Sequence, residues 1–183
     1  MNQNEMATRA IWVGPTKCDD ERDRRTRLVD KVWDRINWDV GFHLELGNAT
    51  DFLREALNCY QNGAFMATAL MCRTCTQTAV YLSISRKVTG LEINTSLESI
   101  HDDWPSIVRK AKKAGMVDDE TEGMLKHITK KGDFAAHYGQ KFDQKTAQGQ
   151  GLGDLWISPS QAREILRQSE KILQHLHNKM SSC

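Results

Sequence analysis

The segment 64–87 constrains the fold of this chain most strongly, because it contains neither glycine nor proline and is apolar on more than one side. At about 3.6 residues per helical turn, its apolar residues fall on two faces of a helix. These residues are Phe65, Ala69, Cys72 and Val80 on one face and Met66, Leu70 and Ile84 on the other. A helix that is apolar on several sides is usually buried among neighbours. The segment therefore predicts a long helix at the centre of a bundle.

Two helices are expected before this segment. A first helix is predicted over 21–38, where apolar residues recur at helical spacing. Gly41 and Gly47 bracket a predicted connection, and Thr50 is the expected N-cap of the second helix. Both helices would pack an apolar face against the central one.

Three further helices are expected after the central segment. Pro105 suits the first turn of a helix that Gly115 closes. The next helix is predicted from near Asp118 to about Tyr138. The run Ser158-Pro-Ser-Gln has the sequence of a capping box, so the last helix is predicted to begin there.

The chain as a whole is predicted to fold as one domain. A length of 183 residues suits a single core, and no segment alternates as a strand would. We therefore predict an all-α fold, a single helical bundle of five or six helices over residues 21–183. Residues 1–20 are expected to form a flexible N-terminal arm. The segment 139–157, rich in glycine and glutamine, is expected to form a long loop.

The composition is that of a soluble globular protein, with 39% hydrophobic and 27% charged residues. No stretch approaches the roughly 20 apolar residues of a membrane-spanning helix, and the start resembles no signal peptide. We therefore expect a cytoplasmic protein with no membrane contact. The formal net charge of +1 gives no global field, so any contact with nucleic acid needs a local basic patch.

The five cysteines are an odd number without a disulfide framework, and we interpret them as reduced thiols. Cys72 and Cys75 form a CxxC motif inside the predicted central helix, where cysteine packs as a small apolar residue. A zinc site would need further ligands at suitable spacing. We therefore predict neither a metal nor a cofactor.

The segment 126–137 is the one that points to chemistry. Its polar residues Lys126, Lys130, Asp133 and His137 follow the spacing i, i+4, i+7 and i+11, which places them in one stripe of a helix. Histidine exchanges protons near neutral pH, and lysines hold phosphate. Asp133 would orient the imidazole or fix a lysine. The alternative interpretation is an ordinary solvated face with lysine–aspartate pairs one turn apart.

A second basic group precedes Gly115 and consists of Arg109, Lys110, Lys112 and Lys113. A charge run of this kind is commonly a solvated helix face. If it lies near the stripe of Lys126 and Lys130, it would instead extend a phosphate-binding surface, whose affinity would depend strongly on salt.

Three features of the sequence together resemble a known family. They are the run from Tyr60 to Arg73, the run Gly132-Asp-Phe-Ala-Ala-His137 and the leucine-rich helix over 159–180. Residues 50–180 resemble the bacterial family called the domain of unknown function number four-one-four-five. That family is similar to the HEPN superfamily of small helical bundles, which are common in bacterial defence and toxin–antitoxin loci.

The resemblance implies roles for individual residues. Catalytic HEPN proteins are metal-independent ribonucleases that carry an arginine, four to six residues and then a histidine, paired across a homodimer. The histidine corresponds to His137 and the polar residue of the motif to Asp133. The permitted positions of the arginine hold Lys130, Lys131 and Gly132 instead. Of these, Lys130 shares the face of His137, but lysine lacks the bidentate fork of arginine.

The earlier helix of the family is matched only in part. Its arginine corresponds to Arg73, whereas its glutamate four residues later corresponds to Gln77, which cannot act as a base. Both departures favour binding over cleavage.

Three hypotheses follow. The first is a non-catalytic or weakly catalytic HEPN-like binding and dimerisation module of a bacterial defence or toxin–antitoxin system. The second is a metal-independent endoribonuclease that uses His137 with Lys130. The third is a plain protein-interaction domain. The candidate catalytic residues are His137, Lys130 and Asp133, and the candidate phosphate-binding residues are Lys126, Lys131, Arg73 and Arg109. The partners implied are a second copy of the chain, RNA or another protein.

Overall fold

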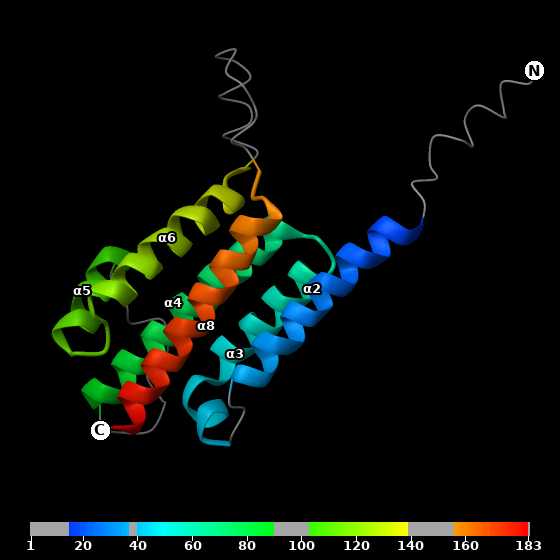
Figure 1. The fold of residues 1–183 in the computed structure, drawn as a ribbon. Coiled ribbons are helices and arrows are strands. Elements are labelled where there is room, and N and C mark those ends of the chain that lie inside the picture. Colours follow the sequence, from blue (N-terminus) through cyan, green and yellow to red (C-terminus); the bar gives the residue numbers. More distant parts are fainter. Residues whose placement is uncertain (1–14, 37–39, 90–102, 139–155, 183) are drawn as a thin grey trace, which may run out of the picture.

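The computed structural model describes residues 15–36, 40–89, 103–138 and 156–182, apart from the side chains of 15–19, 40–45 and 87–89. These ranges hold six α-helices and no strand, which confirms the predicted all-α bundle (Figure 1). The helices are α2 (Pro15–Arg35), α3 (Val40–Gln61), α4 (Phe65–Thr89), α5 (Trp104–Lys113), α6 (Asp119–Ala136) and α8 (Pro159–Ser181). Most of the predicted arm and loop, residues 1–14 and 139–155, lies outside the described residues.

The helix α4 is the centre of the bundle, as its sequence predicts. It contacts α3, α5, α6 and α8, and Figure 1 shows α8 crossing in front of it. Its fully buried residues, among them Ala69, Cys72, Cys75 and Val80, lie on one broad face of the helix, and its other described side chains are partly buried. Its buried hydroxyls bond locally; the hydroxyl of Thr76 donates to the Cys72 carbonyl at 3.0 Å.

The predicted start of the second helix is wrong. Gly41, Gly47 and Thr50 all lie inside α3, which begins at Val40. Thr50 is fully buried, and its hydroxyl donates to the Gly47 carbonyl at 2.6 Å instead of capping a helix start. A glycine inside a helix costs only about 1 kcal/mol relative to alanine. Burial of apolar residues such as Leu46 and Leu53 in the same helix outweighs that penalty.

The predicted bounds of the first helix, 21–38, are also wrong: α2 begins at Pro15 and ends at Arg35, so residues 15–20 of the predicted arm are helical. The starts of α5, α6 and α8, in contrast, are those that capping chemistry predicts. Ser158 and Gln161 form a complete capping box at the start of α8. Asp103 and Asp118 accept hydrogen bonds from backbone N–H groups in the first turns of α5 and α6. Gly115 adopts a φ of +74° after α5, a conformation that residues with a Cβ atom rarely adopt.

A bidentate ion pair fastens α2 to α8. Arg35 Nε donates to Glu170 Oε1 at 2.6 Å, and Arg35 Nη2 donates to Glu170 Oε2 at 2.9 Å. Glu170 is only 5% exposed, so without Arg35 its carboxylate would be left buried and unpaired. The pair therefore fixes where the C-terminal end of α2 meets the bundle.

The helices α6 and α4 approach each other closely at Gly132. A Cβ atom built on Gly132 would lie 2.5 Å from Cβ and 2.6 Å from Cδ of Arg73. The Arg73 side chain thus runs directly over the Gly132 backbone, and its Nη2 reaches Asp133 Oδ1 at 2.9 Å. Arg73 Nε is buried without a hydrogen-bond partner among the described residues, so the close contact leaves one polar group unsatisfied.

This crossing makes a prediction about two glycines of α6. Gly132→Ala should destabilise the protein by about 1–3 kcal/mol, because the new methyl group overlaps the root of the Arg73 side chain. The matched control is Gly123→Ala, where a Cβ meets nothing within 4 Å. That change should stabilise by about 0.5–1 kcal/mol through helix propensity. Urea denaturation monitored by circular dichroism measures both; equal effects of the two substitutions would contradict the crossing.

Candidate functional site

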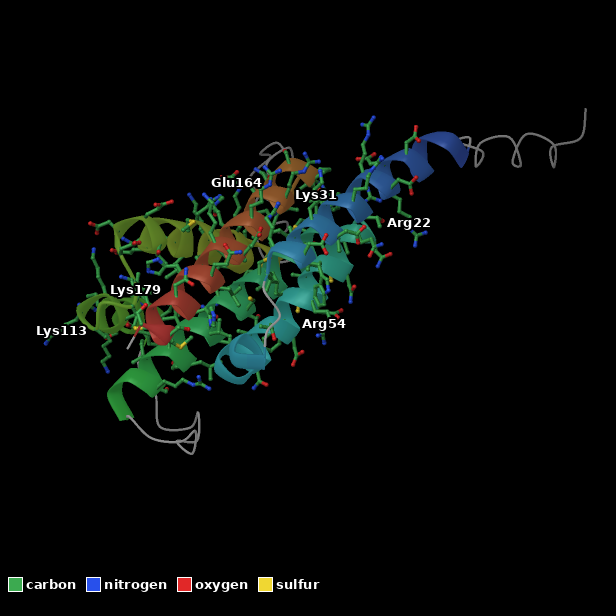
Figure 2. All side chains as sticks on the ribbon, turned by 60° about the horizontal axis from the view of Figure 1, so that its bottom comes forward. Arg22, Lys31, Arg54, Lys113, Glu164 and Lys179 are labelled. Atoms are coloured by element: carbon green, nitrogen blue, oxygen red, sulfur yellow. The ribbon has the colours of Figure 1, made fainter. Side chains whose placement is uncertain are left out.

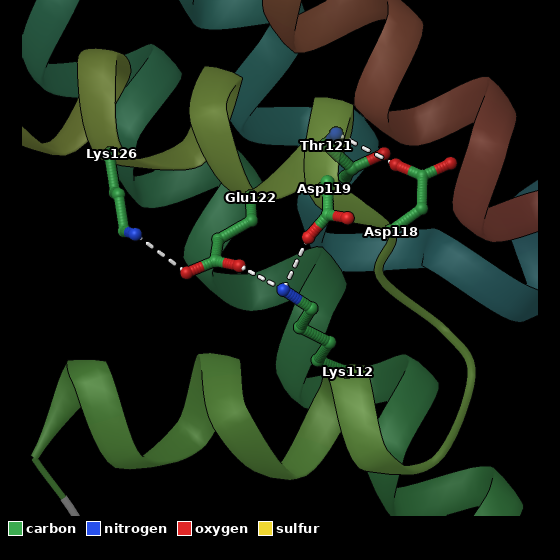
Figure 3. Close-up of polar contacts among 6 residues, drawn as sticks. All are labelled: Lys112, Asp118, Asp119, Thr121, Glu122 and Lys126. Atoms are coloured by element: carbon green, nitrogen blue, oxygen red, sulfur yellow. Dashed lines mark hydrogen bonds and ion pairs between the residues drawn. The ribbon is translucent and has the colours of Figure 1, made fainter.

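The helices α5 and α6 form a hairpin that is fastened at its closed end by a charged cluster (Figure 3). Lys112 Nζ on α5 donates to Asp119 and, at 2.7 Å, to Glu122 Oε2 on α6. The second carboxylate oxygen of Glu122 pairs with Lys126 Nζ at 2.6 Å. The cluster sets the spacing between the two helices where α6 begins.

The same contacts perturb the acid–base properties of the cluster. Hydrogen bonds from Lys112 and Lys126 lower the pKa of Glu122 to about 2. Hydrogen bonds to Asp119 and Glu122 raise the pKa of Lys112. Asp118, the N-cap of α6, has a lowered pKa because the Thr121 backbone N–H donates to its carboxylate. At neutral pH Glu122 and Lys112 are therefore both charged.

Next to this cluster, an open groove of about 590 Å³ lies between the two helices, and it is here called the α5–α6 groove. One wall is largely apolar and comes from the start of α5. The other is polar and comes from successive turns of α6. The lining residues are Trp104, Pro105, Val108 and Arg109 from α5 and Glu122, Lys126, Thr129, Lys130 and Asp133 from α6.

The two carboxylates of the groove are engaged, whereas two of its cations are not. Glu122 pairs with Lys112 and Lys126, and Asp133 pairs with Arg73. Lys130 and Arg109 are exposed and make no ion pair within the part of the chain that the structure describes. The groove therefore presents positive charge that has no partner among the described residues, which favours an anionic ligand.

The structure brings four of the seven candidate residues together. Lys126, Lys130 and Asp133 line the groove from α6, and Arg109 lines it from α5. Arg73 stands behind them on α4 and reaches the groove through Asp133. The basic run before Gly115 thus lies beside the α6 stripe, as one of the two sequence interpretations requires.

Lys131 and His137 are not among the described residues that line the groove. Lys131 is partly buried outside it. His137 is the exposed C-cap of α6, and its backbone N–H donates to the Asp133 carbonyl at 3.0 Å. Seven residues separate His137 from Lys130, which corresponds to a rise of about 10 Å along a helix.

The carboxylate of Asp133 has a partner other than the predicted one. Sequence reasoning paired it with the His137 imidazole or with a lysine of its own helix. In the structure it forms an ion pair with Arg73 on α4, with Asp133 Oδ1 2.9 Å from Arg73 Nη2. The role of Asp133 as an orienting residue for His137 stays a prediction. Its carboxylate instead links α6 to α4 through Arg73.

Two residues of the groove carry no sequence signal of function. Trp104 forms part of the apolar wall, and it belongs to no motif in the sequence. The hydroxyl oxygen of Thr129 is buried and has no hydrogen-bond partner among the described residues. Thr68, Thr74 and Thr76 on α4 all donate to a carbonyl of the preceding turn. Because helical threonines normally bond back in this way, the exception could be found only from coordinates.

The rest of the described surface is mixed in charge. Side chains such as Arg22, Lys31, Arg54 and Glu164 project outward from different helices (Figure 2). Exposed cations that make no ion pair among the described residues, such as Lys31 and Lys113, also occur elsewhere on this surface. The groove is therefore distinguished by its shape and by the way its cations face each other from two helices. None of the helices in the described ranges combines the length and apolar character needed to cross a bilayer.

The CxxC motif belongs to the core. Cys72 and Cys75 are fully buried in α4, and burial raises the pKa of Cys72 to about 12 and that of Cys75 as well. Both therefore remain protonated thiols, which are poor metal ligands. Across the described ranges, no three His, Cys, Asp or Glu side chains are grouped so as to hold a metal ion.

Comparison of the chain with protein-family models, with curated proteins and with solved structures found no match. The resemblance to the HEPN superfamily stays a prediction, carried by the residues quoted for it. The groove has to be interpreted from its own chemistry.

The charged cluster at the closed end of the hairpin predicts a pH dependence. The pKa of Glu122 is lowered from 4.5 to about 2, so its pairing stabilises the fold above pH 4.5 and this contribution is lost as the pH falls towards 2. Lys112→Met should therefore make the decline in stability between these pH values smaller. The control Lys113→Met removes the same charge from the exposed neighbouring position. Urea midpoints across this pH range test the claim, and parallel curves for wild type and Lys112→Met would refute it.

Proposed function

We propose that this chain is a binding module that holds single-stranded RNA in the α5–α6 groove without cutting it. The observation that carries the proposal is the pair of unpartnered cations, Lys130 and Arg109, on opposite walls of a groove whose carboxylates are already engaged. Cations fixed in such a place bind phosphate, and they do so without first breaking an ion pair of the protein.

The size and walls of the groove favour a single strand. A volume of about 590 Å³ is that of a site for a small molecule, which a nucleotide of a flexible strand enters more readily than a stiff duplex. An apolar wall that includes Trp104 is of the kind on which unstacked bases lie. The choice of RNA over DNA rests on the HEPN-like motifs.

Several features favour binding over cleavage. The permitted positions of the catalytic arginine hold Lys130, Lys131 and Gly132. His137 lies at the end of α6, about 10 Å of helical rise from Lys130. A general acid and a phosphate-holding group need to reach the same phosphate. His137 is not among the described residues that line the groove, so cleavage in the groove would require the histidine of a second copy.

The proposal includes the biological setting that the resemblance implies. HEPN-like domains pair as homodimers, so we propose that this chain is a homodimeric component of a bacterial defence or toxin–antitoxin system. Sedimentation of the purified protein tests the oligomeric state directly, with a dimer expected at micromolar concentration. A monomer at that concentration would contradict this part of the proposal without affecting the groove.

Two adjacent lysines provide a matched test of the binding site. Lys130→Ala should weaken binding of a fluorescently labelled single-stranded RNA by roughly tenfold at low salt, about 1.4 kcal/mol. It should also make the dependence of log Kd on log salt shallower by about 0.7. Lys131→Ala removes the same charge one residue later but outside the groove, and it should change little. Fluorescence anisotropy measures both, and equal losses for the two variants would rule out a defined site.

Catalysis is tested by incubating labelled RNA with the protein in EDTA. We expect intact RNA with wild type and with His137→Ala, at protein concentrations that saturate binding. Cleavage by wild type that His137→Ala abolishes, at unchanged thermal stability, would establish the ribonuclease instead. Absence of RNA binding under low salt would leave the third hypothesis, a protein-interaction domain.

A further inference from the structure

We infer that the α5–α6 groove is a pocket for one nucleotide, in which the base lies against Trp104, the phosphate lies between Arg109 and Lys130, and the Thr129 hydroxyl bonds the ligand. This inference rests on the proposed function and specifies its ligand. It differs from a general phosphate-binding surface, because it requires contacts with the base as well as with the backbone.

The lining of the groove has an apolar part and a cationic part, which match the base and the phosphate of a nucleotide. The apolar side chains of Trp104, Pro105 and Val108 gather at the start of α5. The unpaired cations Arg109 and Lys130 come from facing helices, so both can approach one phosphate from different directions. A strip of lysines alone would bind any polyanion. The apolar wall beside them fits a flat, weakly hydrated group that is attached to the anion.

The unsatisfied hydroxyl of Thr129 points to a ligand independently. A buried polar group without a partner destabilises the free protein. Thr129 lines the groove, but its Oγ1 is turned away from water and bonds nothing in the described chain. Threonine in a helix has two accessible χ1 rotamers, and rotation between them moves the hydroxyl to a different position around the Cβ atom. We infer that the bound nucleotide selects the rotamer in which the hydroxyl faces the groove.

This arrangement gives Thr129→Val two opposite effects. Valine has nearly the same shape but no hydroxyl, so the urea midpoint of the free protein should rise. The same change should weaken binding of base-containing RNA. A threonine with only a structural role would not move the two measurements in opposite directions. The control is Thr74→Val on α4, whose hydroxyl already donates to the Leu70 carbonyl. It should lower stability or leave it unchanged, with no effect on binding.

The decisive probe is a pair of single-stranded RNA oligonucleotides of equal length, one normal and one with abasic nucleotides that retain every phosphate. Wild type should bind the normal strand about tenfold more tightly, since stacking on an aromatic side chain contributes about 1–3 kcal/mol per base. Trp104→Leu should bring the affinity for the normal strand down to that for the abasic strand. The control Trp156→Leu changes a tryptophan that is 65% exposed and does not line the groove, and it should keep the preference.

The outcomes separate this inference from the proposed function. Equal affinity of wild type for both strands, with the loss in Lys130→Ala retained, would overturn the nucleotide pocket but keep RNA binding through phosphates. Binding of neither strand would overturn the proposed function itself. If Trp104→Leu fails to fold, the comparison of strands with wild type and Thr129→Val still decides the matter.

Discussion

The packing of α4 against four other helices is the constraint on which the rest of the structure depends. Its neighbours α3, α5, α6 and α8 can each cover it only by turning an apolar face inward, which leaves their polar faces outside. The position of α6 is set most tightly, because Gly132 lets its backbone lie against the Arg73 side chain. That contact also brings Arg73 to Asp133, so the packing of the core determines the charge state of the groove.

In the groove the carboxylates are paired with cations of the protein, whereas two of the cations have no ion pair among the described residues. Asp133 and Glu122 would repel an anion if they were free, but core packing and the hairpin cluster supply each with a cation. Lys130 and Arg109 remain available. Exposed ion pairs of this kind contribute little stability individually. Their effect here is to shape the electrostatic field of the groove, and it connects the fold to the proposed binding of phosphate.

Much of the fold follows from local rules, and most of the site does not. The central position of α4 can be predicted from the sequence, because one uninterrupted segment carries apolar residues on more than one side. The starts of α5, α6 and α8 can also be predicted, because capping residues act within a single turn. The start of α3 was predicted wrongly because burial of Thr50 and its neighbours overrides helix-breaking glycines. The stripe of Lys126 and Lys130 follows from helical periodicity. Its facing wall, and the partner of Asp133, come from other helices and require tertiary packing.

The central claim is that RNA lies between α5 and α6, and photo-crosslinking tests it most directly. Single-stranded RNA that contains 4-thiouridine would be irradiated in complex with the full chain, and the linked peptides identified by mass spectrometry. The account predicts crosslinks within residues 104–109 and 126–133, with none on α2 or α3. Crosslinks concentrated on α2 or α3, or their absence under conditions where RNA is bound, would contradict it.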